Sequence, residues 1–495
     1  LRDPMGRGPG PAHHPGPVRD RPASDAGRAA LGALVQWGYD LLHADEKALL
    51  HQVAVHRGGA SLPSLHAVGA SEGLDEATVT YLLGVLVDKS ILSASFPAEG
   101  ARYDLLDTVR DYALERLAEN GRLAAARRAH AEYFATLADA AWGELRGRDW
   151  QTWVRRLDLE HDNLWAALTY ARDARDKGIA TRLASLAWYF TLAERVTEGR
   201  RFVELALAEA SDDIPFDRRL DALGGLCFLA TEELDLDAAI EIGECALSLE
   251  ATGTDAPQVG FAQATLALAV AAAGDVERGA TLAEQARATL EGGRDHWSSA
   301  VASLLRAHIA AAVGDASTVA AMAADAHRHA DAIGFDAFRV PAMLLDAWVA
   351  ERRSDGDAAT DAYRRALDLA GDAGFADHVA FALSGLASCA LARKDLRHAE
   401  ELQRRALATA EGARADWAAA HARVELGRIL AAAGDTDTAA KLYRNVLEWS
   451  KRPRQHGPRE SLFLALAEDP AAAASTGLAN LGDGRPVTAA EVAPV

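Results

Sequence analysis

Lysine is the rarest charged residue in this sequence. Among 495 residues there are six lysines, and none of them follows a glycine. A Walker A phosphate loop requires Gly-Lys-Ser/Thr, because backbone amides and one ammonium group hold the nucleotide phosphates there. The sequence as given therefore contains no P-loop. The six positions are Lys47, Lys89, Lys177, Lys394, Lys441 and Lys451.

Cysteine and long apolar runs are scarce as well. Cys227, Cys245 and Cys389 lie too far apart for a disulfide framework or a zinc cluster, so we expect reduced thiols in a cytoplasmic protein. No apolar run approaches the roughly 18 residues that a membrane-spanning helix needs, and no membrane association is expected. Residues 1–28 are rich in Pro, Gly and Arg without an apolar segment, which excludes a secretory signal and predicts a disordered tail.

Aromatic residues contribute only 6% of the chain, whereas alanine is abundant. Small unbranched side chains favour helices over sheets, so the composition predicts an all-α fold. The formal net charge of −20 argues against a chain that clamps nucleic acid along its whole length, since phosphate contacts need concentrated positive charge. The length suggests about three domains.

Residues 29–120 are predicted to form a small winged helix-turn-helix domain. Pro97 and Gly100 lie between two short apolar runs, a pattern typical of a β-hairpin. Gly121 is expected to end the last helix. The expected elements are helices over 31–42, 45–56, 75–89 and 107–120, a short segment at 62–68, and hairpin strands within 90–96 and 101–105.

Residues 121–230 read as a helical linker with tetratricopeptide-like (TPR-like) hairpins. Its tryptophans favour core packing between long helices, because large rings bury much apolar area. Residues 451–495 are predicted to be a mostly disordered tail, with one short helix from Glu460 to Glu468. The five tryptophans of the linker are Trp142, Trp150, Trp153, Trp165 and Trp188.

Residues 231–450 contain an internal repeat with a period of 40 residues. One alanine recurs in five copies, and an aspartate recurs eleven residues before it; glycine often precedes the aspartate and also closes each copy. Aspartate caps a helix and glycine ends one, so each copy is a helix pair that must stack on its neighbours to bury its apolar face. This predicts a TPR-like α-solenoid; HEAT-type repeats, which share the period, are the alternative. The alanines are Ala246, Ala286, Ala326, Ala366 and Ala406, with Val446 in a sixth copy, and the closing glycines are Gly253, Gly293, Gly334, Gly374 and Gly412.

Six short segments, taken together and in order, resemble actinobacterial transcriptional regulators of the STAND class (signal transduction ATPases with numerous domains), of the SARP and LuxR types. The part of those proteins that they resemble is the region after the nucleotide-binding module. The resemblance spans about residues 31–450. The segments read QWGYDLL at 36–42, VAVHRGG at 53–59, LVDKSIL at 86–92, RYDLLDTVRDYALERL at 102–117, HAEYF at 130–134 and EHDNLWAAL at 160–168.

The resemblance implies a regulatory role. In that family a DNA-binding domain precedes a P-loop ATPase, and a winged helix, a helical linker and a repeat superhelix follow; the superhelix is the sensor and oligomerisation arm. This sequence matches only the later part and begins with Leu1. We therefore expect a fragment of a longer regulator or a degenerate paralogue. No cofactor is expected, and ATP enters only if an ATPase domain is missing from this chain.

Direct DNA binding by the winged helix is the less favoured alternative. The candidate recognition helix at 75–89 carries Asp75, Glu76 and Asp88 against Lys89 alone. A reading helix needs Arg, Lys, Asn or Gln directed at base edges and phosphates. Residues 31–130 hold nine Lys/Arg and thirteen Asp/Glu, a net charge of −4, which favours a winged helix that packs on other protein.

No catalytic or metal-binding constellation stands out, and we expect no enzyme activity. Residues 160–163 (Glu-His-Asp-Asn) are interpreted as a helix N-terminus capped by Asp162 or Asn163 rather than as an acid–base group. His327 and His329 are two apart, so on a helix they face different directions and cannot bind one ion together.

The sequence thus predicts the sensor and protein-interaction part of a STAND-type transcriptional regulator. The expected partner is a protein, peptide or small-molecule effector held in the superhelix, and homo-oligomerisation stays open. A regulator that binds DNA directly and a TPR scaffold without regulatory output are the alternatives. Candidate partner-binding residues on the first helix of each pair are Gln263, Arg306, His308, Trp348 and His421.

Overall fold

The computed structural model describes residues 25–70, 72–209, 215–249, 257–413, 415–451 and 470–482. Within these ranges the chain divides into two compact units. One unit holds the described residues up to 55 together with 59–126, and the other holds 56–58 and the described residues from 127 onward. Gly253 and the helix expected over Glu460–Glu468 lie outside the described residues.

The first unit is a winged helix. Its three-stranded antiparallel sheet has the order β1-β3-β2, with Leu92 opposite Leu105 and Ala60 opposite Tyr103. Leu49, Leu65 and Leu83 lie in the core between the helices and the sheet. The elements are α1 (Asp25–Asp40), α2 (Ala44–Ala54), β1 (Ala60–Ser61), α3 (Leu62–Ala70), α4 (Glu76–Asp88), β2 (Leu92–Ser95), β3 (Arg102–Leu105) and α5 (Asp107–Glu119).

Strand β1 is the element of this unit that the sequence analysis missed. It is two residues long, which is too short to show the alternation of polar and apolar residues that marks a strand. The helix expected at 107–120 is present as α5, and Gly121 follows it at a φ of 69°, the left-handed conformation that favours glycine.

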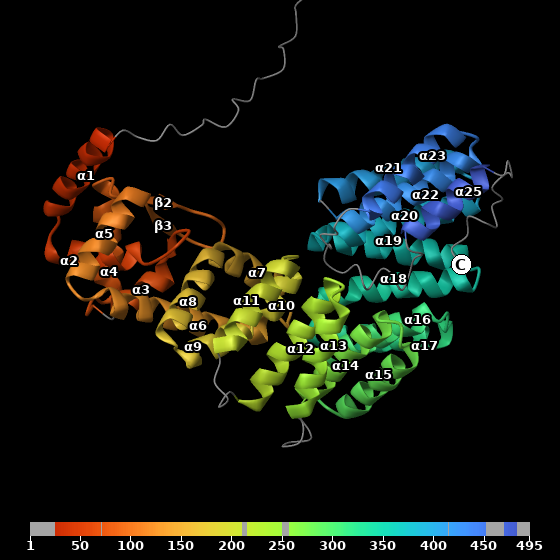
Figure 1. Ribbon diagram of the computed structural model, residues 1–495, viewed down its shortest axis with the longest axis horizontal. Helices are drawn as coiled ribbons and strands as arrows, with labels where there is room; N and C mark the ends of the chain where they lie inside the picture. Colours follow the sequence, from red (N-terminus) through yellow and green to blue (C-terminus); the bar gives the residue numbers. More distant parts are fainter. Residues whose placement is uncertain are drawn as a thin grey trace, which may run out of the picture. The chain divides into compact units, whose positions relative to one another are not determined.

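The second unit is all helical (Figure 1). The linker contributes α6 (Leu123–Glu144), α7 (Trp150–Leu159), α8 (His161–Ala174), α9 (Lys177–Ala184), α10 (Ala187–Leu192) and α11 (Val196–Glu209). The repeats contribute the pairs α12 (Phe216–Glu232) and α13 (Leu236–Ser248), α14 (Pro257–Ala272) and α15 (Val276–Leu290), α16 (His296–Ala312) and α17 (Ala316–Ile333), α18 (Asp336–Arg352) and α19 (Gly356–Ala373), α20 (Ala376–Ala392) and α21 (Leu396–Gly412), and α22 (Asp416–Ala432) and α23 (Thr436–Ser450).

The 40-residue period corresponds to one helix pair. The recurring alanine lies in the second helix of its pair in every copy and has no exposed surface, and Val446 in the sixth copy is equally buried. A side chain this small allows neighbouring helices to approach closely, and each pair packs on the next. The result is a TPR-like α-solenoid, as the sequence analysis predicted.

The turn within each pair also repeats. The residue before the aspartate has a positive φ in all six copies, and it is glycine in three of them (Gly274, Gly314 and Gly434). The aspartate that follows begins the second helix, and in five copies its carboxylate accepts a backbone N–H from the first turn. Hydrogen bonds from Thr318 hold the pKa of Asp315 below its ordinary value.

Removing one of these caps should weaken its helix pair. Asp395 accepts the backbone N–H of His398 at 3.1 Å. We expect Asp395→Ala to lower the free energy of unfolding by about 1 kcal/mol, and Asp395→Asn to retain most of it because the amide oxygen also accepts. Urea unfolding followed by circular dichroism checks this; equal losses in both variants would show that the cap is not the cause.

The predicted disordered tail is partly wrong. Residues Pro470–Gly482 form α25, which packs on α22 and α23 with Ala473 and Ala474 buried. The physical reason is visible in the segment: Pro470 begins the helix, four alanines follow, and the apolar residues recur at helical spacing. Residues 451–495 are rich in Pro, Ala and Gly, which favours a prediction of disorder, but alanine is also the best helix former.

Candidate ligand-binding site

A small apolar cavity, partly open to solvent, lies in the second unit. Its walls come from the linker helix α10 and from α12, α16, α18 and α20, the first helices of four different pairs. Its volume is about 60 Å³, measured as space for water centres. The lining residues are Trp188, Thr191, Leu192, Phe228, Val301, Leu304, Leu305, His308, Ala337, Phe338, Pro341 and His378.

Aromatic rings form much of the wall. The ring of Trp188 meets Trp297 edge-on at 4.9 Å between centroids and approaches Phe228 and Phe338 at 5.9 and 6.0 Å. The indole N–H of Trp188 is buried and has no hydrogen-bond partner among the described residues. A buried donor without a partner is destabilising by about 1–3 kcal/mol. Less than 1 Å² of this nitrogen is exposed, so the rings of Trp188, and not its N–H group, form the wall of the cavity.

Two buried imidazoles provide the other polar groups. The Nδ1 atom of His308 lies 2.6 Å from the carbonyl oxygen of Leu304, and Nδ1 of His378 lies 2.9 Å from Oδ1 of Asp377. Burial lowers the pKa of His308 to about 4, with the nearby His378 acting in the same direction. His308 is therefore neutral at pH 7.

The lowered pKa of His308 has a consequence for stability. In the unfolded chain, His308 is protonated near its ordinary pKa of 6.5. In the folded chain its pKa is about 4, so it takes up a proton only at lower pH. His308 therefore does not change the free energy of unfolding above pH 7. Below that, its contribution lowers the free energy of unfolding as the pH drops from 6.5 towards 4. Between pH 7.5 and 5 we expect His308 to account for roughly 2 kcal/mol of lost stability. The variant His308→Asn should lose less over this interval in urea unfolding; an unchanged pH profile would contradict the assignment.

A second, more polar crevice lies where linker helix α7 meets the loop before α20. Its volume is about 400 Å³, and its walls include Arg155, Asp158 and the segment 371–375. Trp150, only 4% exposed, closes the crevice: its ring stacks on Phe375 at 5.5 Å and lies 5.9 Å from Phe335. The linker therefore contacts the starts of α18 and α20 directly.

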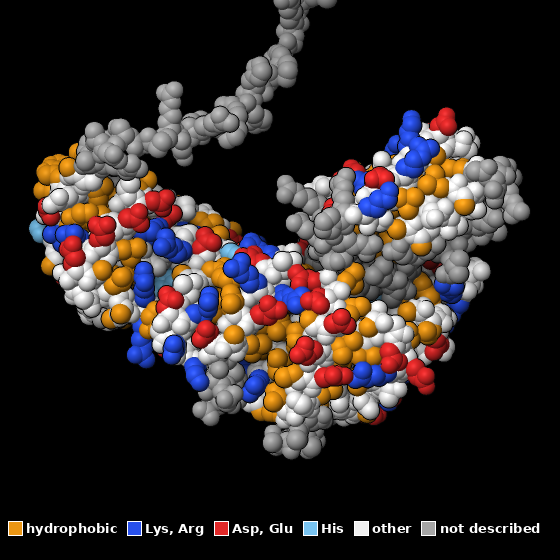
Figure 2. Space-filling view, in the orientation of Figure 1, with side chains coloured by type: hydrophobic (Ala, Val, Ile, Leu, Met, Phe, Trp, Pro, Cys, Tyr) orange, Lys and Arg blue, Asp and Glu red, His pale blue; other side chains and the backbone are white. Residues whose placement is uncertain are grey.

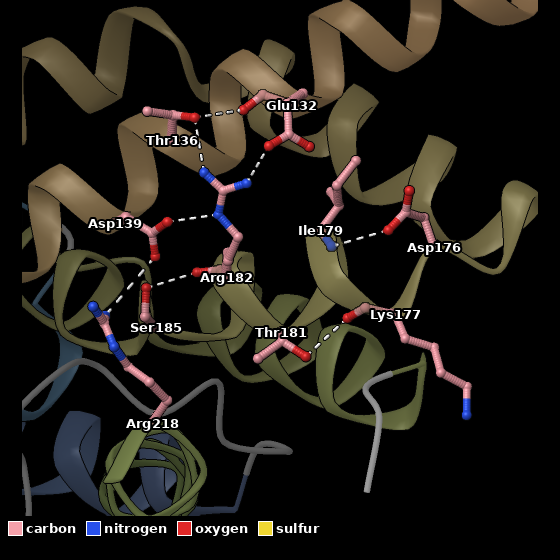
Figure 3. Close-up of polar contacts among 10 residues, drawn as sticks. All are labelled: Glu132, Thr136, Asp139, Asp176, Lys177, Ile179, Thr181, Arg182, Ser185 and Arg218. Atoms are coloured by element: carbon pink, nitrogen blue, oxygen red, sulfur yellow. Dashed lines mark hydrogen bonds and ion pairs between the residues drawn. The ribbon is translucent and has the colours of Figure 1, made fainter. Parts of the chain in front are cut away.

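Arg182 holds the linker helices together (Figure 3). From α9 its guanidinium donates to Asp139, Glu132 and Thr136, which lie along one face of α6. Asp139 also lies 4.0 Å from Arg218 of α12, the first repeat helix. Three carboxylate and hydroxyl partners for one arginine fix the angle between α6 and α9, so this cluster is structural.

Of the five predicted partner-binding residues, one lines the cavity. His308 does so, whereas Gln263 accepts a hydrogen bond from Thr289, and Arg306 pairs with Glu284 at 3.0 Å. Trp348 lies beneath the guanidinium of Arg352, and His421 stacks between Trp417 and Phe381. The structure does not bring these four together with His308.

The sequence analysis missed Trp188, Phe228, Phe338 and His378. A signal for two of them exists. Phe338 and His378 are 40 residues apart and occupy equivalent places in successive repeats, and so do Val301 and Pro341. Comparing the first helices column by column would have found this wall. The same comparison reaches the other two, because Trp188 and Phe228 are 40 residues apart and Phe228 and His308 are 80 apart.

Residues 160–163 form neither the predicted cap nor an acid–base group. Glu160 flanks the start of α8, while Asp162 and Asn163 lie inside its first turn without capping it. Asn163 is fully buried because it serves a different purpose: its amide nitrogen donates to Glu160 at 2.7 Å and its oxygen lies 3.1 Å from Nε2 of His130. Burial lowers the pKa of His130 to about 4, so this imidazole is neutral at pH 7, and its contact with Asn163 is structural.

The histidines of the repeats do not gather. His327 pairs with Asp346 at 2.9 Å, and His329 faces His296 at 3.0 Å, so the two point in different directions as predicted. Among the residues that the structure describes, no group of three or more His, Cys, Asp or Glu could hold a metal ion.

The recognition helix of the winged unit, α4, carries little free positive charge. Asp75 is its N-cap, and the Nζ atom of Lys89 at its end lies 2.5 Å from Oε1 of the buried Glu46. On the face shown in Figure 2, Asp and Glu side chains lie among the Lys and Arg side chains of the winged unit. Phosphate binding needs a concentration of positive charge, which acidic neighbours oppose.

The fold defines the class of the protein: a winged helix-turn-helix unit followed by a TPR-like α-solenoid. In sequence, the chain is homologous to HTH-type transcriptional regulators of Mycobacterium tuberculosis and Mycobacterium bovis, with 34% identity over 195 residues. The match covers 36% of this chain and 21% of those proteins, so the chain spans about a fifth of the length of the curated relatives it matches. An uncharacterised protein of Mycobacterium tuberculosis is 44% identical over 92 residues, which is 18% of this chain and 23% of that protein.

Among solved structures, the chain resembles a signal transduction ATPase with numerous domains (STAND) that has a tetratricopeptide repeat sensor, from Pyrococcus horikoshii. The TM-score is 0.58 at 14% identity, covering 91% of this chain and 64% of that one. This likeness shows the fold. No family model matches the sequence. None of the helices among the described residues is long and apolar enough to cross a membrane.

Proposed function

We propose that this chain is the sensor and interaction part of a transcriptional regulator of the STAND type, of the SARP or LuxR kind, in which the solenoid binds an effector and the winged helix passes on the change. One observation carries the proposal: a single chain homologous to HTH-type regulators contains both a winged helix and a solenoid with an apolar pocket. The chain would act by binding, without catalysis. No cofactor is proposed for this function, and ATP would have a role only if an ATPase domain is missing from this chain.

Direct reading of DNA by the winged helix is the second candidate. It is supported by the homology to HTH-type regulators, but the charges described for α4 oppose it. A gel-shift titration with genomic DNA fragments at low and high salt separates the two. We expect no binding by this chain; tight binding that weakens steeply with salt would favour the second candidate.

Transcript measurements test the regulatory role. Deleting the gene in its own organism should change a limited set of transcripts, and restoring the whole gene should return them to normal. A variant in which the solenoid cannot stack, Ala366→Asp, should fail to restore them, because a carboxylate would be buried without a partner. Control variant Ala358→Asp changes an exposed residue of α19 and should restore them. An unchanged transcript profile after deletion would refute the regulatory proposal.

A further inference from the structure

We propose that His296 and His329 together bind a divalent transition-metal ion, such as Zn²⁺. The two residues lie at the same end of the third repeat pair, His296 at the start of α16 and His329 in the last turns of α17. This inference goes beyond the proposed function, which needs no metal. It rests on the distance between two ring nitrogens, on their access to solvent and on a departure from the repeat pattern.

The two imidazoles face each other with the same ring atom. Nδ1 of His296 lies 3.0 Å from Nδ1 of His329, and the ring centroids are 5.3 Å apart. Zinc binds histidine nitrogen at about 2.0–2.1 Å, so two nitrogens of a tetrahedral site lie about 3.3–3.4 Å apart. The observed separation is only slightly shorter. A small rotation of the two rings would therefore admit the ion.

Both nitrogens can offer a lone pair at neutral pH. Without a metal, the contact requires that one Nδ1 carries a hydrogen and donates it to the other. With the ion bound, each ring would carry its hydrogen on Nε2 instead. Burial, with Arg328 and His296 acting in the same direction, lowers the pKa of His329 below its ordinary value. This imidazole is therefore uncharged at pH 7, which is the form that binds metals.

Solvent and ions can reach the pair. Both side chains are partly exposed, and His329 lines a crevice of about 190 Å³ between the end of α15, α16 and α17. The two arginines of this crevice are each paired with a carboxylate. Arg287 lies 2.8 Å from Glu284, and Arg328 lies 2.5 Å from Asp325. Their charges are therefore largely balanced and repel a cation only weakly.

The coordination would be completed by water. Among the residues that the structure describes, no third His, Cys, Asp or Glu completes a metal-binding group with the pair. Zinc sites that are not purely structural keep a position for water in the same way. Two protein ligands hold an ion less tightly than the four of a structural site, so we expect a metal that exchanges with solvent. Imidazole ligands favour Zn²⁺ and Cu²⁺ over Mg²⁺.

The histidine pair is a departure from the repeat. The position of His296 on the first helix and that of His329 on the second helix recur every 40 residues, and none of the other five copies has a histidine at either position. The stacking of helix pairs therefore does not require these imidazoles. The N-cap Asp295, which accepts the backbone N–H of Ser298 at 3.0 Å, fixes the start of α16 and with it the place of His296.

Calorimetric titration of the purified whole chain with ZnCl₂, in an excess of Mg²⁺, tests the proposal. We expect saturable Zn²⁺ binding that Mg²⁺ does not prevent. His296→Gln and His329→Gln each remove one ligand and keep a polar side chain. Each should weaken Zn²⁺ binding at least roughly tenfold, since even losing an outer-shell partner of a metal ligand costs about that much. Zn²⁺ should also raise the urea midpoint of the unchanged chain, because only the folded state holds the two rings together.

Two controls separate this pair from other histidines. His327→Gln changes a residue of the same helix whose imidazole pairs with Asp346 at 2.9 Å, and it should leave Zn²⁺ binding unchanged. His13 and His14 are adjacent in the sequence, and replacing both by alanine should also leave it unchanged. Circular dichroism shows whether each variant is folded.

A rescue variant separates ligation from a structural effect. His329→Cys restores a zinc ligand and should recover the binding that His329→Gln loses. No saturable binding up to millimolar Zn²⁺, equal binding in both Gln variants and the unchanged chain, or loss of binding on replacing His13 and His14 would overturn the proposal. Failure of His329→Cys to recover binding would overturn it as well. None of these results depends on the transcript measurements, so the regulatory role stands or falls separately.

Discussion

Replacing Trp150 by alanine is expected to lower the free energy of unfolding of the solenoid unit by about 3–5 kcal/mol. The indole ring is almost completely buried, and it stacks on Phe375 with an angle of 15° between the ring planes. Removing it leaves an empty space between α7 and the starts of α18 and α20, because neither Phe335 nor Phe375 can fill the volume of an indole. Urea unfolding followed by circular dichroism measures the loss.

Trp153 supplies the matched control. It lies one turn further along α7, is only partly buried and packs beneath the guanidinium of Arg156 at 4.7 Å. Trp153→Ala should destabilise by about 1 kcal/mol, the range of an exposed cation–π contact. Hydrogen exchange adds a local readout: amides of 371–375 should lose protection in Trp150→Ala only. Equal losses in the two variants would mean that the contact with Phe375 does not hold the linker.

Adding a single methyl group at Gly385 is expected to destabilise the chain by about 3 kcal/mol or more. A Cβ atom at this position of α20 would lie 2.2 Å from Cζ of Tyr363, far inside van der Waals contact. The ring of Tyr363 is 4% exposed, so moving it away would push it against other buried side chains. A similar close approach recurs further along the chain, where a Cβ at Gly427 would lie 2.5 Å from the ring of Tyr443.

Gly371 offers the comparison on the neighbouring helix. It lies in α19, and a Cβ atom added there would meet no neighbouring side chain within 4 Å. Gly371→Ala should therefore raise stability by about 0.5–1 kcal/mol through reduced backbone freedom of the unfolded chain. Gly385→Ala combined with Tyr363→Leu should recover part of the loss. A similar stability change in Gly385→Ala and Gly371→Ala would show that the tyrosine ring adapts at little cost.

The sequence specified the repeat architecture because its signals are local. An aspartate cap, a turn residue at positive φ and a buried alanine each act within one helix pair, so their spacing alone predicts the pair and its stacking. The solenoid and the helical class follow from these residues. Strand β1 and helix α25 did not follow, since one is too short to show a pattern and the other has a composition shared with disordered tails.

The cavity and the contact between Trp150 and Phe375 depend on how helices far apart in the sequence are placed in space. No short sequence pattern encodes that placement. Trp150 meets Phe375 only after several helix pairs have each added a small rotation, and errors in these rotations accumulate along the chain. Trp188 faces Phe338 for the same reason. Choosing residues by position on the first helix identified His308 but also Gln263 and Arg306, whose polar groups are satisfied by neighbouring helices.

Helix α25 acts as a cap on the last described repeat pair, α22 and α23. It covers the last pair with Ala473 and Ala474 and turns Ser475 and Thr476 to the solvent. A polypeptide that stops at residue 451 would leave Tyr443 and its neighbours without this cover, and the exposed end could accept the matching end of a second molecule. A chain that lacks α25 should therefore show concentration-dependent pairing or filaments, which sedimentation would detect.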